Sequence, residues 1–140
     1  MPSILRNALA VIAGIVLGSV VNMTLVSVGP SIVRLPEGAD FSTMEGLAKS
    51  MPLLSPRHFL FPFLAHALGT LTGAWIAGKL GASRRMALAL GVSVYFLLGG
   101  IAAVAMIGGP LWFAATDLVL AYLPMGYLGA MLAGAGPRRT

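Results

Sequence analysis

Three polar side chains stand out in this sequence because each interrupts a long apolar run. They are Asp117, His66 and Asn22. Asp117 and His66 are the only acidic or basic residues in the four longest apolar runs. An aspartate and a histidine can exchange a proton or hydrogen-bond a small polar molecule, and an asparagine adds a donor and an acceptor. Ionisable groups are costly in lipid, so they pair with a partner or mark a functional site.

These side chains are predicted to lie at one depth. Asp117 is the seventh residue of its run, His66 the eighth of its own, and Asn22 the sixth from the end of its run. At 1.5 Å per residue each lies roughly 8–12 Å below the same surface. We predict that Asp117 and His66 are neighbours, as a neutral hydrogen-bonded pair or as an ion pair, and that Asn22 completes the network. Thr70, one turn after His66, and Tyr122 complete the set of ligand- or proton-binding candidates.

A purely structural role for the same residues stays open, because polar groups also hydrogen-bond across helices to hold them together in lipid. One acid and one histidine are too few to predict a metal site. No serine or cysteine nucleophile is partnered to His66, and the chain has no cysteine. The sequence therefore predicts no metal, no cofactor and no catalytic residue, and it argues against an enzyme.

The elements that position these residues are predicted to be four membrane-spanning helices. About 20 apolar residues are needed to cross the hydrocarbon core, and residues 8–27, 59–78, 86–107 and 111–132 meet that length. They are helices rather than strands because a helix satisfies its own backbone hydrogen bonds. With 58% hydrophobic and only 9% charged residues, the surface is suited to a lipid bilayer. The basic residues lie at the ends of the runs, which argues against nucleic-acid binding.

Short connections at residues 79–85 and 108–110 require neighbouring helices to be antiparallel. The expected fold is therefore all-α: a single transmembrane domain, residues 1–140, forming an up-down four-helix bundle. Orientation follows from lysines and arginines in short loops. Six of these basic residues lie on one side of the membrane: Arg6, Lys79, Arg84, Arg85, Arg138 and Arg139. This excess predicts that both termini are in the cytoplasm. Three lie on the other side, among acidic residues: Arg34, Lys49 and Arg57.

The one long connection, residues 29–57, is predicted to be an external loop that starts irregularly. Ser42 and Glu45 fit a capping box, and apolar residues then recur at helical spacing from Met44 to Met51. Pro52 ends the pattern. We expect a short amphipathic helix that lies on the membrane surface or folds over the bundle.

Small residues predict how the helices pack. Gly14 and Gly18 share a face with Asn22, and Gly69 and Gly73 form a similar stripe. Both pairs match the small-xxx-small pattern that allows helices to approach closely. We expect the first two spans to pack through these stripes.

Three further residues bear on the space around Asp117. Pro124 interrupts the fourth span and leaves the carbonyl of Leu120 without its helical partner. Gly99 and Gly100 lie at about the depth of the polar residues, where they leave room for a cavity or a close helix contact.

Three segments, residues 62–70, 111–113 and 117–122, resemble a group of small four-helix bacterial membrane proteins with no established activity. The resemblance covers most of the chain and implies a location in the bacterial inner membrane. It implies no function.

Three functions therefore stay open at the level of the sequence, and the weakest of them is an intramembrane enzyme that uses His66 and Asp117 as a general acid–base pair. The first is a binding or transport module that handles a small solute or protons at the Asp117–His66 site. The second is a non-catalytic accessory or assembly subunit of a larger membrane complex. Four helices enclose little interior, so a transporter of this size is expected to form a homo-oligomer.

Overall fold

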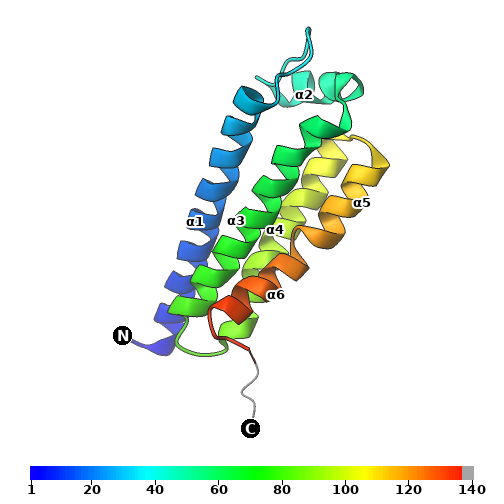
Figure 1. Cartoon of the computed structure of the whole chain (residues 1–140). Helices are drawn as coiled ribbons and strands as arrows, with labels where there is room; N and C mark the ends of the chain where they lie inside the picture. The colour runs from blue at the N-terminus through cyan, green and yellow to red at the C-terminus, as the bar shows by residue number, and fades with distance from the viewer. Residues whose placement is uncertain (137–140) are drawn as a thin grey trace.

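The computed structural model describes residues 1–136, and every regular element within them is helical (Figure 1). The α-helices are α1 (Ser3–Ile32), α2 (Met44–Ser50), α3 (Leu60–Leu80), α4 (Arg85–Ile107), α5 (Leu111–Leu120) and α6 (Leu123–Leu132). Two 3₁₀ turns, Met51–Leu53 and Pro56–Phe59, lie between α2 and α3. Four stretches are long and apolar enough to cross a membrane: Ser3–Ile32, Pro56–Leu80, Arg85–Ile107 and Leu111–Leu132. The predicted all-α class and the four long apolar helices are confirmed.

Helix α1 is longer than the predicted 8–27 span. It begins at Ser3 and continues through Pro30 to Ile32, so the irregular start expected for the loop is wrong for residues 29–32. A proline there removes only one hydrogen bond in the last turn. The backbone N–H of Val33 still donates to the carbonyl of Gly29, which closes the helix end.

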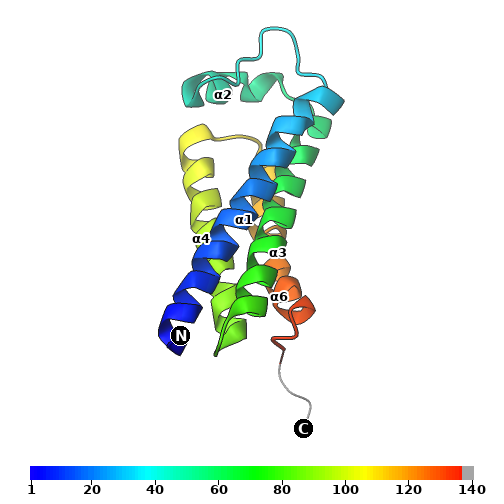
Figure 2. The ribbon, with the colours of Figure 1, turned by 90° about the vertical axis from the view of Figure 1, so that its left-hand side faces the viewer.

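Helix α3 is the centre of the packing and contacts α1, α4 and α6 (Figures 1 and 2). Its tightest contact is with α1. A Cβ atom built on Gly14 would lie 2.5 Å from the carbonyl oxygen of Gly73, and one on Gly18 would lie 2.6 Å from that of Gly69. No side chain fits at that separation, so the two backbones touch. The predicted packing of the first two spans through glycine stripes is confirmed.

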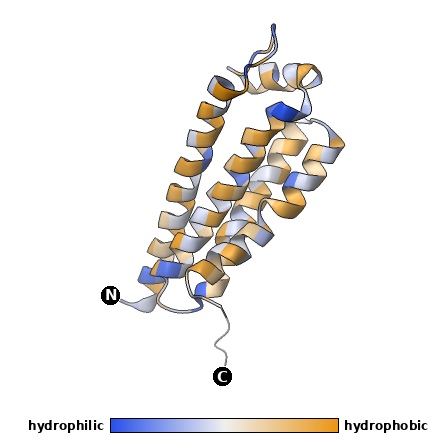
Figure 3. Cartoon of the chain, viewed as in Figure 1, coloured by the Kyte–Doolittle hydropathy of each residue, from blue (hydrophilic) through white to orange (hydrophobic). Residues whose placement is uncertain are grey.

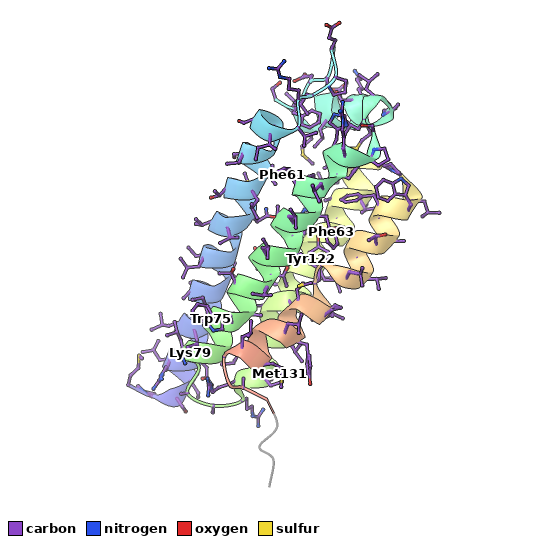
Figure 4. All side chains as sticks on the ribbon, viewed as in Figure 1. Phe61, Phe63, Trp75, Lys79, Tyr122 and Met131 are labelled. Atoms are coloured by element: carbon purple, nitrogen blue, oxygen red, sulfur yellow. The ribbon has the colours of Figure 1, made fainter. Side chains whose placement is uncertain are left out.

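The outer and inner surfaces of the helices differ in side-chain size. The buried hydrophobic positions are mostly alanines, and Val92, Thr70 and Ser93 are the largest side chains that are fully buried. Large apolar side chains instead point outward along every long helix, whereas hydrophilic residues concentrate near the two ends of the molecule (Figures 3 and 4). Small residues inside allow the helices to approach closely.

A break separates α5 from α6 near the predicted interruption at Pro124. The backbone of Tyr122 leaves the helical region, at φ −114° and ψ −81°, and α6 starts at Leu123. The Tyr122 side chain reaches Asp117, to which its hydroxyl donates a hydrogen bond. Gly100 of α4 makes this possible, because a Cβ atom there would collide with the Tyr122 hydroxyl.

The loop between α1 and α3 contains the predicted short helix, α2, which lies across one end of the long helices and contacts α4 (Figure 2). Its N-cap is Thr43, whose side chain accepts a hydrogen bond from the Gly46 N–H at 2.9 Å. The predicted Ser42 cap is therefore one residue too early. Ser42 instead donates to Asp40 through its backbone N–H and its hydroxyl, at 2.9 and 2.6 Å.

The opposite end, which we call the basic end, is where α1 begins and α3 ends. The Arg6 side chain donates to the Leu80 carbonyl oxygen at 2.9 Å, and the Asn7 side-chain oxygen accepts from the Ala82 N–H at 2.8 Å. Arg85 reaches the carbonyl oxygens of Gly78 and Ala133. Four of the six basic residues assigned to one side lie here, and Arg138 and Arg139 lie outside the described residues.

Candidate functional site

Asp117 of α5 and His66 of α3 are in direct contact, as predicted. The Nδ1 atom of His66 lies 2.9 Å from both carboxylate oxygens of Asp117. The two side chains differ in exposure: 3% of the Asp117 side chain is accessible and 26% of the His66 side chain. The His66 side chain is therefore partly exposed on one side and contacts the buried Asp117 carboxylate on the other.

Tyr122 completes this pair. Its hydroxyl donates to Oδ2 of Asp117 at 3.1 Å, and its ring stacks on that of His66 with centroids 5.8 Å apart. In an uninterrupted helix, a residue five positions after another lies about 140° round the axis. The break after Leu120 brings Tyr122 back towards Asp117, so this contact depends on the break.

The hydrogen bonds define which nitrogen of His66 remains free. One proton bridges Nδ1 and the Asp117 carboxyl group, so Nδ1 is occupied by this bond whichever of the two groups carries the proton. No residue in 1–136 hydrogen-bonds Nε2 of His66. His58 differs, because its Nδ1 accepts from the Ser55 N–H and its Nε2 faces the Arg34 carbonyl oxygen at 3.0 Å. His58 holds the loop together, whereas His66 has one nitrogen available for chemistry.

A cavity of about 200 Å³ lies beside His66, which we call the polar cavity. It is lined by Asn22 of α1, by His66, Gly69 and Thr70 of α3, by Phe96, Gly99, Gly100 and Ala103 of α4, and by Tyr122. Tyr122 lies about halfway along the long helices (Figure 4). Four of the five predicted candidate residues therefore line one space, and the fifth, Asp117, lies directly behind it.

Thr70 has an unusual environment in this cavity. Its hydroxyl is buried and has no hydrogen-bond partner among the described residues. Thr24, Thr116 and Ser93 instead donate to the carbonyl four residues earlier, at 2.8, 2.8 and 3.0 Å. An unsatisfied buried hydroxyl costs about 1–3 kcal/mol. The sequence indicated Thr70 by its spacing from His66, but nothing in the sequence indicated that its hydroxyl would lack a partner.

Asn22 does not join the Asp117–His66 network, so that prediction is wrong. Its only hydrogen-bond contact within residues 1–136 is a long one, 4.0 Å from Nδ2 to the sulfur of Met23. The reason is its position over Gly69: a Cβ atom on that glycine would lie 3.0 Å from the Asn22 Cβ. Asn22 reaches the polar cavity but not the pair.

The cavity lies where α1 and α4 separate. The two helices cross near the basic end and diverge towards the loop end, where α2 lies across them (Figure 2). Gly99 of α4 lines the cavity and is exposed, and a Cβ atom on it would meet nothing within 4 Å. Gly99 is therefore an exposed part of the cavity wall.

No family model, no curated protein and no solved structure matches this chain. The geometry of the site is therefore the evidence available for the function of this protein. Within residues 1–136, no three histidine, cysteine, aspartate or glutamate side chains gather closely enough to hold a metal ion.

Proposed function

We propose that the chain is an integral membrane protein of the bacterial inner membrane, folded as an up-down four-helix bundle with both termini in the cytoplasm. The four long apolar helices, the large apolar side chains on their outer faces and the hydrophilic ends support insertion. The basic residues gathered at the basic end support the orientation.

Within that frame, we propose that the protein is a small binding or transport module that handles a small solute together with a proton. The observation that carries the proposal is the buried Asp117–His66 pair beside a cavity with an unpartnered Thr70 hydroxyl. The Asp117–His66 pair carries one negative charge when it holds a single proton and is electrically neutral when it holds a second one. A solute that bonds to Nε2 of His66 would therefore change the affinity of the pair for that proton.

A purely structural pair would be expected to leave no polar group unsatisfied, because buried polar groups are normally hydrogen-bonded. Asp117 meets that expectation, since His66 and Tyr122 both donate to it. The buried Thr70 hydroxyl does not, and it belongs to a residue that lines the same cavity as His66, whose partly exposed side chain leaves Nε2 without a partner among the described residues. The unsatisfied groups favour a ligand site over structural support alone.

The accessory-subunit alternative loses one of its supports. Small-residue faces on a membrane helix can bind another protein, but Gly14, Gly18, Gly69 and Gly73 are used in the contact between α1 and α3. A homo-oligomer remains part of the proposal, because one chain has little interior of its own.

Proton movement in proteoliposomes tests the function. A pH gradient is imposed, and an internal dye follows its decay for the wild type, Asp117→Asn and His66→Gln. Thr116→Val is the matched control, because Thr116 is next to Asp117 in the chain but exposed and bonded to Trp112. The wild type and the control should dissipate the gradient faster than protein-free vesicles, and the two site variants should not. A wild type no faster than empty vesicles, or site variants as fast as the wild type, would overturn the proposal.

A further inference from the structure

We propose that the polar cavity binds an uncharged hydroxyl compound whose apolar body is about the size of one six-membered ring, taken up from the lipid phase between α1 and α4. The inference rests on the proposed function and adds to it the class of ligand and the route by which the ligand arrives. Four observations carry it: the size of the cavity, its unsatisfied hydrogen-bonding groups, its apolar wall and the direction of its open side.

The size of the cavity limits the ligand to a small molecule. A dry cavity of about 150 Å³ is known to hold one benzene ring. The polar cavity, at about 200 Å³, has room for one ring with a hydroxyl group. A longer apolar chain would have to extend out through the open side.

The two unsatisfied groups are suited to a hydroxyl. His66 and Thr70 are one turn apart on α3, so their side chains are neighbours on the same face. A ligand hydroxyl can donate to the neutral Nε2 of His66 while it accepts from the Thr70 hydroxyl. When His66 is protonated, the same group can accept from Nε2 and donate to Thr70. A hydroxyl therefore satisfies both groups in either protonation state.

The wall that α4 contributes to the cavity favours an apolar, uncharged body. Phe96, Gly99, Gly100 and Ala103 form the wall contributed by α4 and present no polar side chain. The only buried charged group nearby, Asp117, is already bonded by His66 and Tyr122. Asp117 does not itself line the cavity, so an ion bound here would not contact the carboxylate, and burying a charge without a direct partner is strongly unfavourable.

The access route is sideways. Towards the basic end, the contact of Gly14 and Gly18 with α3 leaves no space for a ligand. At the loop end, α2 lies across the long helices. The opening that we assign to the ligand lies between α1 and α4 beside Gly99, which is exposed and on which a Cβ atom would meet nothing within 4 Å. In the proposed orientation this gap opens to lipid, in which only an uncharged and largely apolar compound dissolves well.

Phenol and toluene are matched probes of this chemistry, because they share the ring and differ in the hydroxyl. Protein in lipid nanodiscs is titrated with each, and the amide chemical shifts of Gly99 and Gly100 give the dissociation constants. Phenol should bind the wild type saturably and about tenfold more tightly than toluene, the ratio expected for one good hydrogen bond. Equal binding of the two probes, or no saturable binding of phenol, would overturn the proposal.

Thr70→Val keeps the shape of the side chain and removes the hydroxyl. It should weaken phenol binding several-fold and leave toluene binding unchanged, whereas Thr116→Val should change neither. The amide spectrum away from the cavity shows whether each variant is folded. Phenol binding that is unchanged in folded Thr70→Val would contradict the assigned role of that hydroxyl.

The lateral route has its own matched pair of variants on α4. Gly99 and Gly91 are both exposed, and neither would bring a Cβ atom within 4 Å of another residue, but only Gly99 lines the cavity. Gly99→Leu should abolish phenol binding, and Gly91→Leu should leave it unchanged. Full binding by Gly99→Leu would overturn the lateral route.

These experiments separate the inference from the proposed function. Proton movement that depends on Asp117 and His66, without phenol binding, would leave the proposed function standing and reject this class of ligand. Saturable phenol binding that depends on Thr70, without proton movement, would support the ligand class and reject the proton-handling function.

Discussion

The space between α1, α3 and α4 has two halves: a closed half towards the basic end, around Gly14 and Gly18, and an open half towards the loop end, around Gly99 and Gly100. Both halves contain glycines, but the helices touch in only one of them. Towards the basic end, Gly14 and Gly18 rest on the carbonyl oxygens of α3, and the interface is closed. Towards the loop end, Gly99 meets nothing, and Gly100 faces the Tyr122 hydroxyl instead of another backbone. Glycine therefore closes an interface only where the partner helix converges on it.

The polar side chains fall on the open side of this division. His66 and Thr70 line the cavity, and Asp117 lies behind it. No acidic or basic side chain takes part in the glycine contact of the closed half. We interpret the closed half as the part that holds the helices together and the open half as the part that binds.

The largest effect is expected in the closed half, from Gly18→Leu. A side chain there must displace the backbone of α3 or the ring of Phe96, and overpacking of this kind costs about 3 kcal/mol. Gly91→Leu is the control, because its position has open space. Denaturant unfolding in micelles measures both free energies. Equal free energies of unfolding for the two variants would contradict the close backbone contact between α1 and α3 in the closed half.

The next effect concerns the pair in the open half. A double-mutant cycle of Asp117→Leu and His66→Leu should give a coupling energy of about 1–2 kcal/mol, the upper range for hydrogen bonds between membrane helices. The matched cycle pairs Asp117→Leu with Asn22→Leu and should give none, because Asn22 does not bond to Asp117. Equal coupling in the two cycles would mean that the geometry of the site is different.

A smaller and local effect is expected at α2, which covers the loop end of the open half. Thr43→Ala removes the N-cap and should destabilise α2 by about 1 kcal/mol. Hydrogen exchange of the α2 amides measures the loss. Ser42→Ala tests the cap position expected from the sequence: if it frays α2 more than Thr43→Ala does, the observed cap is wrong.

The smallest effect is the pH dependence of the same loop. Hydrogen bonds from the Ser42 side chain, and then from its backbone, lower the pKa of Asp40 below its usual 3.8. A lowered pKa in the folded state adds stability above that usual value, and the contribution is lost as the pH falls further through the folded pKa. Protection of the loop amides should therefore decrease below about pH 4. Asp40→Asn should remove this pH dependence, and its persistence would assign the effect to another group.

Much of the fold was predictable because it follows from local patterns. Apolar length predicted the four long helices, and the spacing of Gly14 and Gly18 predicted the contact with α3. The proline at 124 predicted the interruption between α5 and α6. The cap of α2 was displaced by one residue because Ser42 and Thr43 are both good N-caps, and the competing bond to Asp40 is visible only in three dimensions.

The candidate site was predictable in depth but not in direction. The rise per residue placed Asp117, His66 and Asn22 at one level, and the first two do meet. Depth does not specify where a side chain lies around its helix, and Asn22 packs over Gly69 instead. The contact of Tyr122 with Asp117 requires a break whose geometry the sequence does not specify.

Native mass spectrometry of the gently extracted protein tests the central claim, a ligand site in the open half, most directly. The wild type is compared with Asp117→Asn, which keeps the size of the side chain and removes its charge, and with Thr116→Val as the control. The account predicts a small bound mass in the wild type and the control that is absent from Asp117→Asn. A wild type with no bound mass, or the same mass retained by Asp117→Asn, would contradict it and make the polar residues structural.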